Sequence, residues 1–319
     1  MKNILKVMLT GGSGFIGSNL IRAFRDENIR TLSVDINLPE FETPDEFIRA
    51  DVRDFSLIER IIHSFRPECI IHLAAVATIQ EAALSPVKTW QINTEGTRSV
   101  INANKNSGCD SKIIFASTDK VYGRIKFTEK YTEDMLIRPL EGSPYDQSKA
   151  EADRLVMCNG GTVLRLCNIY GPYDTHMTRI VPVNVKRILS GCPGILSKYR
   201  DESGVHNFFR DMLHVNDLCK AVISLLRRMN ISPERFAGQA FNIGTSECCS
   251  MESVLDEICR SSGSSLNHEI RYADINHELP VQTMDISKAV SWFNYSPSVS
   301  ISEGIKHTVQ WWKGRNKEI

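Results

Sequence analysis

The stretch Gly11-Gly12-Ser13-Gly14-Phe15-Ile16-Gly17 decides the fold of this chain of 319 residues. It lies between an apolar segment, residues 4–10, and a segment in which apolar residues recur at helical spacing, residues 15–24. This order of strand, glycine turn and helix lets bare backbone approach a pyrophosphate, while the helix N-terminus donates amides to it. Glycine turns also arise for conformational reasons alone, so the neighbouring segments decide the interpretation.

Strands and helices alternate through the first half of the chain. Further strands are expected at residues 31–34, 47–49, 69–74, 112–117 and 162–166, with helices near 54–65, 86–105 and 144–158. Alternation of this kind predicts an α/β fold, a doubly wound parallel sheet of Rossmann type with helices on both faces.

After about residue 170 the alternation fades. Shorter strands near 239–243 and 269–272 mix with helices near 216–228, 250–261 and 301–314, and the last helix opens with Ser300 and Glu303 at capping-box spacing. We therefore expect a nucleotide-binding domain over residues 1–170. A smaller, mixed α/β lobe, mainly substrate-binding, is expected over residues 171–319, and the chain can cross back between the two.

Asp35 ends the second expected strand. A carboxylate there accepts hydrogen bonds from the adenosine ribose hydroxyls and repels the additional phosphate of NADP. Taken alone, an aspartate at a strand end is more often a local cap. Following the glycine turn at this distance, Asp35 predicts NAD as the cofactor.

The composition excludes several classes of partner. Lys and Arg number 38, as do Asp and Glu, so no field of one sign attracts nucleic acid or anionic lipid. The longest central stretch without charge or proline, residues 69–80, is of strand length, so we expect no membrane span and no signal peptide. The 9 cysteines form no CxxC pair and the 8 histidines lack metal-ligand spacing. We expect a soluble cytoplasmic protein with reduced thiols and no metal.

A second motif covers residues 117–149. Tyr145 and Lys149 face the same way if they lie on a helix, and an ammonium beside a phenol stabilises the phenolate. Thr118, at the end of the preceding strand, can hydrogen-bond to a reacting hydroxyl. The spacing alone is common by chance, but with a dinucleotide motif upstream it predicts an enzyme.

With these motifs, nearly the whole chain resembles the extended short-chain dehydrogenase/reductase family, and within it the NAD-dependent nucleotide-sugar epimerases and dehydratases. The resemblance implies a nucleotide-activated sugar as substrate and a homodimer formed through the helices near 86–105 and 144–158. It also implies that NAD is bound by Gly11, Gly14, Phe15, Ile16, Gly17, Asp35, Asp51, Val52, Leu73, Ala74, Ala75, Asn93, Tyr145 and Lys149.

The resemblance extends to the substrate. Thr118 is expected to bind the sugar, Asn168 to contact the diphosphate, and Arg210 to contact the nucleotide, which suits a guanidinium fork. A salt bridge from Arg210 to Asp211 or Asp217 is the alternative.

The residues after Thr118 bear on the reaction. Epimerases acting at carbon 4 resemble one another in having small or unreactive side chains there, whereas this chain has Asp119 and Lys120. The pair resembles that of CDP-glucose 4,6-dehydratases and of dehydratases acting on UDP-N-acetylglucosamine. In 4,6-dehydratases the aspartate protonates the departing hydroxyl of carbon 6, and its neighbour removes the carbon-5 proton. We expect a 4,6-dehydratase that converts an NDP-hexose to an NDP-4-keto-6-deoxyhexose while keeping NAD tightly bound.

Alternatives to the dehydratase remain open. The commoner neighbour of the aspartate is glutamate, and Lys120 could instead pair with Asp119 or point to solvent. An epimerase at carbon 4 or carbon 2 is one alternative; the CDP-sugar 2-epimerases resemble this segment but carry asparagine in place of Asp119. A non-catalytic NAD-binding module is the other, and the intact set of Thr118, Tyr145 and Lys149 argues against it.

Overall fold

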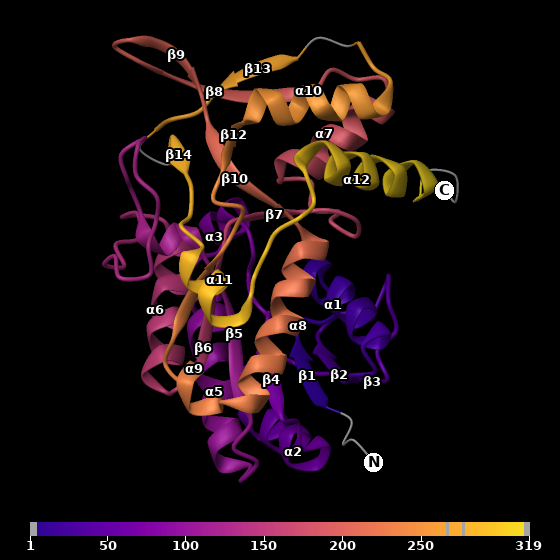
Figure 1. Ribbon diagram of the computed structural model, residues 1–319, viewed down its shortest axis with the longest axis vertical. Helices are drawn as coiled ribbons and strands as arrows, with labels where there is room; N and C mark the ends of the chain where they lie inside the picture. Colours follow the sequence, from indigo (N-terminus) through magenta and orange to yellow (C-terminus); the bar gives the residue numbers. More distant parts are fainter. Residues whose placement is uncertain (1–4, 266–267, 276–277, 316–319) are drawn as a thin grey trace. The chain divides into compact units, whose positions relative to one another are not determined.

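The computed structural model describes residues 5–315 except 266–267 and 276–277 (Figure 1). The chain divides into two compact units. Unit 1 lies within Met1–Tyr122, Leu136–Arg165 and Val222–Phe241, and unit 2 within Gly123–Met135, Leu166–Ala221 and Asn242–Ile319. The chain therefore passes between the units more than once. The division into a cofactor domain and a substrate domain near residue 170 stays a prediction.

A seven-stranded sheet organises the first part of the fold. Its strands are β1 (Lys6–Thr10), β2 (Arg30–Asp35), β3 (Glu46–Arg49), β4 (Cys69–His72), β5 (Lys112–Thr118), β6 (Thr162–Leu166) and β11 (Ala240–Ile243). Their order is β11-β6-β5-β4-β1-β2-β3, and the pairs from β3 to β5 are parallel. This is the strand order of a doubly wound dinucleotide-binding sheet, so the predicted fold class is confirmed. Ile4, expected in the first strand, lies outside the described residues.

Helices pack against this sheet and connect its strands. They are α1 (Phe15–Asp26), α2 (Phe55–Phe65), α3 (Ile79–Leu84), α4 (Pro86–Trp90), α5 (Gly96–Asn106), α6 (Pro144–Cys158), α8 (Val215–Ile231) and α9 (Pro233–Phe236). A π-helical turn, η1 (Gln91–Glu95), joins α4 to α5, so the helix expected near 86–105 is interrupted. π-helical turns often occur at functional sites, and this one contains Asn93.

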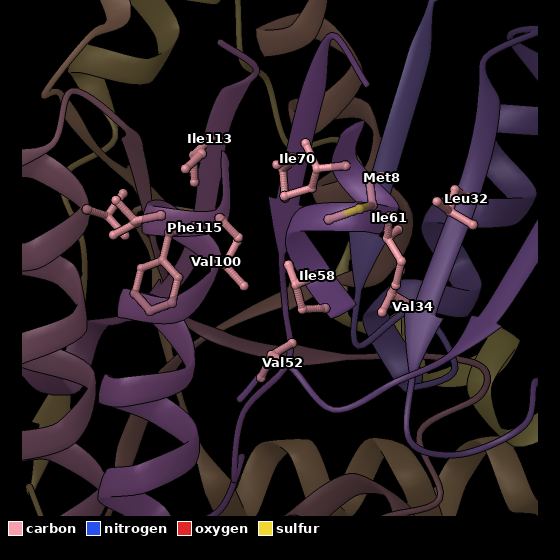
Figure 2. Close-up of a cluster of buried hydrophobic side chains, with 14 of the residues drawn as sticks. Met8, Leu32, Val34, Val52, Ile58, Ile61, Ile70, Val100, Ile113 and Phe115 are labelled. Carbon is pink, nitrogen blue, oxygen red and sulfur yellow. The ribbon is translucent and has the colours of Figure 1, made fainter. Parts of the chain in front are cut away.

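Apolar side chains from the strands and helices form the core of unit 1 (Figure 2). The central strand β1 buries Val7, Met8 and Leu9 completely, which explains why the sequence shows an apolar run there rather than alternation. Met8 packs in one cluster with Ile58 on α2 and Val100 on α5. This packing holds the carboxyl ends of β1, β4 and β5 at one edge of the sheet.

Unit 2 contains two smaller sheets. β7 (Asn168–Tyr170), β10 (Phe209–His214), β12 (Cys248–Ser250) and β14 (Val281–Gln282) form one, and β8 (Ile195–Asp201), β9 (Gly204–Asn207) and β13 (Glu269–Tyr272) form the other. Both sheets mix parallel and antiparallel pairs, so the mixed character predicted for the C-terminal part is confirmed.

The helices of unit 2 are α7 (Ile180–Leu189), α10 (Met251–Ser262), α11 (Ser287–Phe293) and α12 (Ile301–Arg315). Ser300 accepts a hydrogen bond from the amide of Glu303 at 3.2 Å, as the capping-box spacing predicts. Across the described ranges, every helix is too short or too polar to span a bilayer.

Candidate active site

Three glycines in and after the turn between β1 and α1 have no room for a side chain. Gly11 has a φ of +75°, and a Cβ there would lie 2.6 Å from the amide nitrogen of Ala74. A Cβ on Gly12 would lie 2.3 Å from the Ser33 hydroxyl, and one on Gly17 would lie 2.5 Å from the Cα of Gly12. Gly11, Gly12 and Gly17 are therefore required by packing, and Gly11 is required by its conformation as well.

The N-terminus of α1 fits an anionic ligand. Gly14 occupies the cap position in extended conformation, no side chain of the described residues caps the helix there, and its first turn carries no acidic side chain. A helix end of this kind presents backbone amides and a partial positive charge. The turn and the helix together fit a dinucleotide pyrophosphate.

Asp35 lies at the end of β2, beside the glycine turn. One carboxylate oxygen accepts from the amide of Ser13 at 3.0 Å, and the other accepts from the amide of Asn37 at 2.9 Å. Each oxygen of an ionised carboxylate has a further lone pair, so Asp35 can still accept from two ribose hydroxyls.

Asp51 and Val52 have different surroundings. The Arg53 guanidinium pairs with Asp51 at 2.6 Å, and this hydrogen bond holds the pKa of Asp51 below its ordinary value despite partial burial. The side chain of Val52 belongs to the hydrophobic core and packs against Gly96. Contacts of these two residues with an adenine ring remain predictions.

His72 ends β4 and is a structural residue. Thr97 donates its hydroxyl to the carbonyl of Asn93 at 2.6 Å, so it accepts from Nε2 of His72, and Nδ1 accepts from the hydroxyl of Thr10 at 2.6 Å. These bonds fix a neutral tautomer. Burial, with Lys149 nearby, lowers the pKa of His72 to about 3. The next residues, Leu73, Ala74 and Ala75, are half-buried, and Ala74 contacts the glycine turn.

Asn93 on η1 connects two segments of the site. Its carbonyl oxygen accepts from the amide of Val76 at 2.7 Å, and its nitrogen donates to Val76 and to the hydroxyl of Ser148 on α6. The side chain is 1% exposed. Asn93 therefore holds α6 against the loop after β4, and its contact with the cofactor remains a prediction.

The helix α6 carries Tyr145 and Lys149. Ser143 caps it by accepting from the amide of Asp146, so Tyr145 stands in the first turn and Lys149 one turn later. Lys149 donates from Nζ to the carbonyl of Ala116 on β5, and Nζ lies 4.0 Å from the centre of the Phe115 ring. Burial lowers the pKa of Lys149 to about 7, although the carboxylate of Asp153 opposes the shift. This amine changes its charge near neutral pH.

Thr118 ends β5 and directly precedes a short turn that contains Asp119 and Lys120. Its hydroxyl donates to Asp119 at 3.1 Å and accepts from the amide of Lys120 at 3.3 Å. Thr118 and Asp119 are buried, and Lys120 is half-buried. The short helix η2 (Asp119–Tyr122) contains the acid and the amine. The structure thus places Thr118 two residues beyond the carbonyl that binds Lys149.

Besides Thr118 in unit 1, two further residues expected to bind the substrate, Asn168 and Arg210, lie in unit 2. Nδ2 of Asn168, at the start of β7, is buried and has no hydrogen-bond partner among the described residues. Arg210 on β10 pairs with Glu278 and donates to the carbonyl of Phe209 at 2.8 Å. The alternative prediction, a salt bridge from Arg210 to Asp211 or Asp217, is wrong, because Arg210 pairs with Glu278. Asp211 accepts from Thr245 and Ser246, and Asp217 accepts from Ser298 and Val299.

Comparison with known proteins identifies the family. Residues 7–244 match the model of the NAD dependent epimerase/dehydratase family. The chain belongs to this family. It is therefore an enzyme with NAD as its cofactor, and the resemblance to extended short-chain dehydrogenases/reductases is confirmed.

Proteins similar to this enzyme include both dehydratases and epimerases. It is 28% identical to a dTDP-glucose 4,6-dehydratase of Xanthomonas campestris pv. campestris (strain B100), over 96% of this chain and 92% of the relative. It is 26% identical to a CDP-paratose 2-epimerase of Salmonella typhi, over 96% of this chain and 99% of the relative. The solved structure of Thermus thermophilus UDP-glucose 4-epimerase in complex with NAD has a TM-score of 0.85 and 27% identity, over 97% and 99%.

Sequence reasoning missed two polar partners of the candidate site residues, Glu278 and Asp153. Glu278, which pairs with Arg210, is 68 residues away in the chain and has no motif around it. Asp153, whose carboxylate acts on Lys149, lies at the helical spacing of one turn from that lysine. That spacing is the one signal that could have indicated Asp153 from the sequence.

Proposed function

We propose that this enzyme is an NDP-hexose 4,6-dehydratase that forms an NDP-4-keto-6-deoxyhexose. The observation that carries the proposal is the pair Asp119 and Lys120 in the turn after Thr118, with Asp119 2% exposed and hydrogen-bonded to the Thr118 hydroxyl. An acid and a base at adjacent positions suit an elimination, which a simple inversion does not need. The dTDP-glucose 4,6-dehydratases among the relatives, at 27–28% identity, support this choice.

The first step is oxidation of the sugar at carbon 4. Bound NAD supplies the hydride acceptor for this step and the hydride donor for the last. Tyr145, as the phenolate, takes the proton of the carbon-4 hydroxyl, and the Lys149 ammonium stabilises the phenolate. The Thr118 hydroxyl breaks its hydrogen bond to Asp119 and donates instead to the same substrate oxygen. The glycine turn, the N-terminus of α1 and Asp35 would hold the cofactor.

The second step is loss of water. The new ketone acidifies the carbon-5 proton, which Lys120 removes as the base, while Asp119 protonates the carbon-6 hydroxyl as it leaves. The double bond formed between carbons 5 and 6 then accepts the hydride at carbon 6 and a proton at carbon 5.

Two residues of unit 2 are proposed to bind the rest of the substrate. The buried Nδ2 of Asn168 is a donor with a hydrogen bond still to make, which suits a diphosphate oxygen. The guanidinium fork of Arg210 suits phosphate or ribose oxygens. Arg210 must break its ion pair with Glu278 before it can bind the nucleotide.

A carbon-2 or carbon-4 epimerase is the second candidate. The CDP-paratose 2-epimerase of Salmonella typhi and the UDP-glucose 4-epimerase of Thermus thermophilus favour it. An epimerase would use the same oxidation by Tyr145, and Asp119 would have no proton to deliver.

Product mass tests the proposal. Purified enzyme is incubated with dTDP-, CDP-, UDP- and GDP-hexoses, with Tyr145→Phe as the inactive control. We expect loss of one water from one of these substrates and, in heavy water, one deuterium at carbon 5. A product of unchanged mass would assign the enzyme to the epimerases.

We also propose that the enzyme forms a homodimer through the helices near 86–105 and 144–158, with the exposed surface of α3 and α4 as part of the interface. Leu84, Val87 and Trp90 there are 85%, 72% and 42% exposed, which is costly for apolar side chains in water. Sedimentation at micromolar concentration is expected to give a dimer, and Val87→Glu to give a monomer. Leu38→Glu, at a site 67% exposed elsewhere, is the control and should stay dimeric. A monomeric wild type would contradict the proposal.

A further inference from the structure

A buried ion pair lies behind the candidate catalytic residues of unit 1. Arg165 on β6 donates from Nε and from Nη2 to the two carboxylate oxygens of Asp153 on α6, each at 3.0 Å. The side chains of Arg165 and Asp153 are 3% and 0% exposed. Two parallel hydrogen bonds fix both the distance and the orientation of the partners.

The ion pair contacts each segment that carries a candidate catalytic residue. Ser117, which directly precedes Thr118 on β5, donates its hydroxyl to Asp153 at 2.7 Å. Tyr122, which ends the turn containing Asp119 and Lys120, accepts from Nη1 of Arg165 at 2.9 Å. The Arg165 guanidinium also lies 4.9 Å from the centre of the Tyr122 ring. Asp153 itself lies one helical turn after Lys149.

These contacts determine the position of α6 along the direction of β5. Alternate residues of a strand share a face, so Phe115 and Ser117 both face α6, where they meet Lys149 and Asp153. Lys149 binds the carbonyl of Ala116, and Asp153 binds the hydroxyl of Ser117. Two bonds to neighbouring residues determine how far along the strand α6 lies, and so where Tyr145 lies relative to Thr118.

Stability alone does not account for the pair. Burial opposes the charge of Arg165, but the hydrogen bonds and the charge of Asp153 outweigh it and raise the pKa of Arg165. The desolvation of two buried ions offsets most of their attraction, and apolar residues of similar volume are often as stable. Apolar residues would not, however, hold Ser117 and Tyr122 at defined positions.

We propose that Asp153 and Arg165 are positioning residues whose ion pair places α6 against the end of β5 and anchors the turn from Asp119 to Tyr122. The inference rests on the roles proposed above for Tyr145 and Lys149. It does not depend on dehydration, because epimerases and dehydratases share the initial oxidation of the sugar.

Ser117→Ala is the main test, since it breaks the bond between β5 and Asp153 and leaves the ion pair intact. The expected result is a fall of about tenfold in the first-turnover rate of cofactor reduction, because small displacements of reacting groups have large effects. Substrate KM and NAD dissociation constant should stay near the wild-type values, and the melting temperature should fall by an amount similar to that of the control described next, because each variant loses one buried hydrogen bond. Ser111→Ala is the matched control, because Ser111 is also buried and donates to the carbonyl of Pro67 at 2.6 Å, before β5 begins.

Asp153→Asn removes the charge, and a larger loss of rate is expected if the variant folds. Should it fail to fold, Ser117→Ala still decides the question. A first-turnover rate for Ser117→Ala equal to that of wild type or of Ser111→Ala would overturn the proposal.

Tyr122→Phe separates this inference from the proposed reaction. For a dehydratase, it should slow product formation about tenfold while the first-turnover reduction stays within about twofold, because the turn carries the acid and the base. Tyr295→Phe, which removes a buried hydroxyl bound to the carbonyl of Gly244, is the control. If the wild-type product has unchanged mass, the dehydratase proposal fails, and the Ser117→Ala result alone decides the positioning role.

Discussion

Burial determines the charge of two basic side chains near the ends of β4 and β5. His72 has a partner on each ring nitrogen and stays neutral, whereas Lys149 keeps the opposing carboxylate of Asp153 and has a pKa of about 7. A basic side chain in the sequence does not by itself reveal which of these charges it carries. The contacts of a buried residue decide its charge, and they also allow the effect of replacing that residue to be predicted.

Asp119→Asn and Lys120→Met distinguish dehydration from inversion. Asparagine keeps the size of Asp119 but cannot give up a proton, so oxidation at carbon 4 should survive while elimination slows by roughly a hundredfold. Reduced cofactor should then accumulate on the enzyme, which its absorbance measures. Lys120→Met should block elimination in the same way. Full turnover by both variants would contradict the dehydratase.

Asp35 should determine the choice of cofactor. Its carboxylate suits ribose hydroxyls and repels a 2′-phosphate, so the wild type should bind NAD more tightly than NADP. Asp35→Asn removes the charge and should improve NADP binding relative to NAD by about tenfold. Titration of both cofactors measures this, with Asp45→Asn as the control because Asp45 instead accepts from the amide of Thr31. Equal binding of both cofactors by the wild type would exclude this role.

At the scale of elements, α1 can lie close to the glycine turn only because Gly12 and Gly17 have no side chains. The helix packs so closely on the glycine turn that a Cβ at Gly17 would lie 2.5 Å from the Cα and 2.6 Å from the carbonyl oxygen of Gly12. Both atoms belong to the backbone and cannot rotate away. The position of the helix N-terminus, and with it the fit to a pyrophosphate, depends on this contact.

Gly17→Ala is therefore expected to displace α1. Overpacking of this kind costs about 1–3 kcal/mol of stability, and the NAD dissociation constant should rise about tenfold or more. Calorimetric titration with NAD and denaturant unfolding measure the two effects. Gly314→Ala on α12 is the control, since its Cβ would meet no atom within 4 Å. Unchanged NAD affinity in Gly17→Ala would show that α1 is placed by other contacts.

At the scale of the whole molecule, buried polar groups couple stability to pH. Burial lowers the pKa of His72 from 6.5 to about 3, so the unfolded chain binds the proton more readily than the folded one. Its contribution to stability is complete above about pH 6.5 and is lost as the pH falls from 6.5 towards 3. The loss approaches ~1.4 kcal/mol per pH unit.

Denaturant unfolding across this pH range tests the coupling. His72→Asn should be less stable than wild type at neutral pH, by about 1–3 kcal/mol, because one of its buried hydrogen bonds is lost. Its stability should also fall less steeply below pH 6.5. His63→Asn, at an exposed position on α2, should keep the wild-type slope. Parallel pH profiles for wild type and His72→Asn would refute the assignment.

Sequence by itself determined the alternating strands and helices, the glycine turn, and the candidate residues Thr118, Asp119, Tyr145 and Lys149. These features depend on the period of apolar residues and on turn chemistry, which neighbouring residues encode. The family match confirms the fold and the cofactor that they predicted.

Tertiary structure decided what neighbouring residues do not encode. The strands β7, β12 and β14 of unit 2 have 3, 3 and 2 residues, too few for a detectable period, and they form because distant segments pair with them. The partners of Asn93, Asp153 and Arg210 come from other elements, and only packing brings them together. The charge of each buried ionisable group follows from these partners, because the cost of desolvating a charge depends on everything around it.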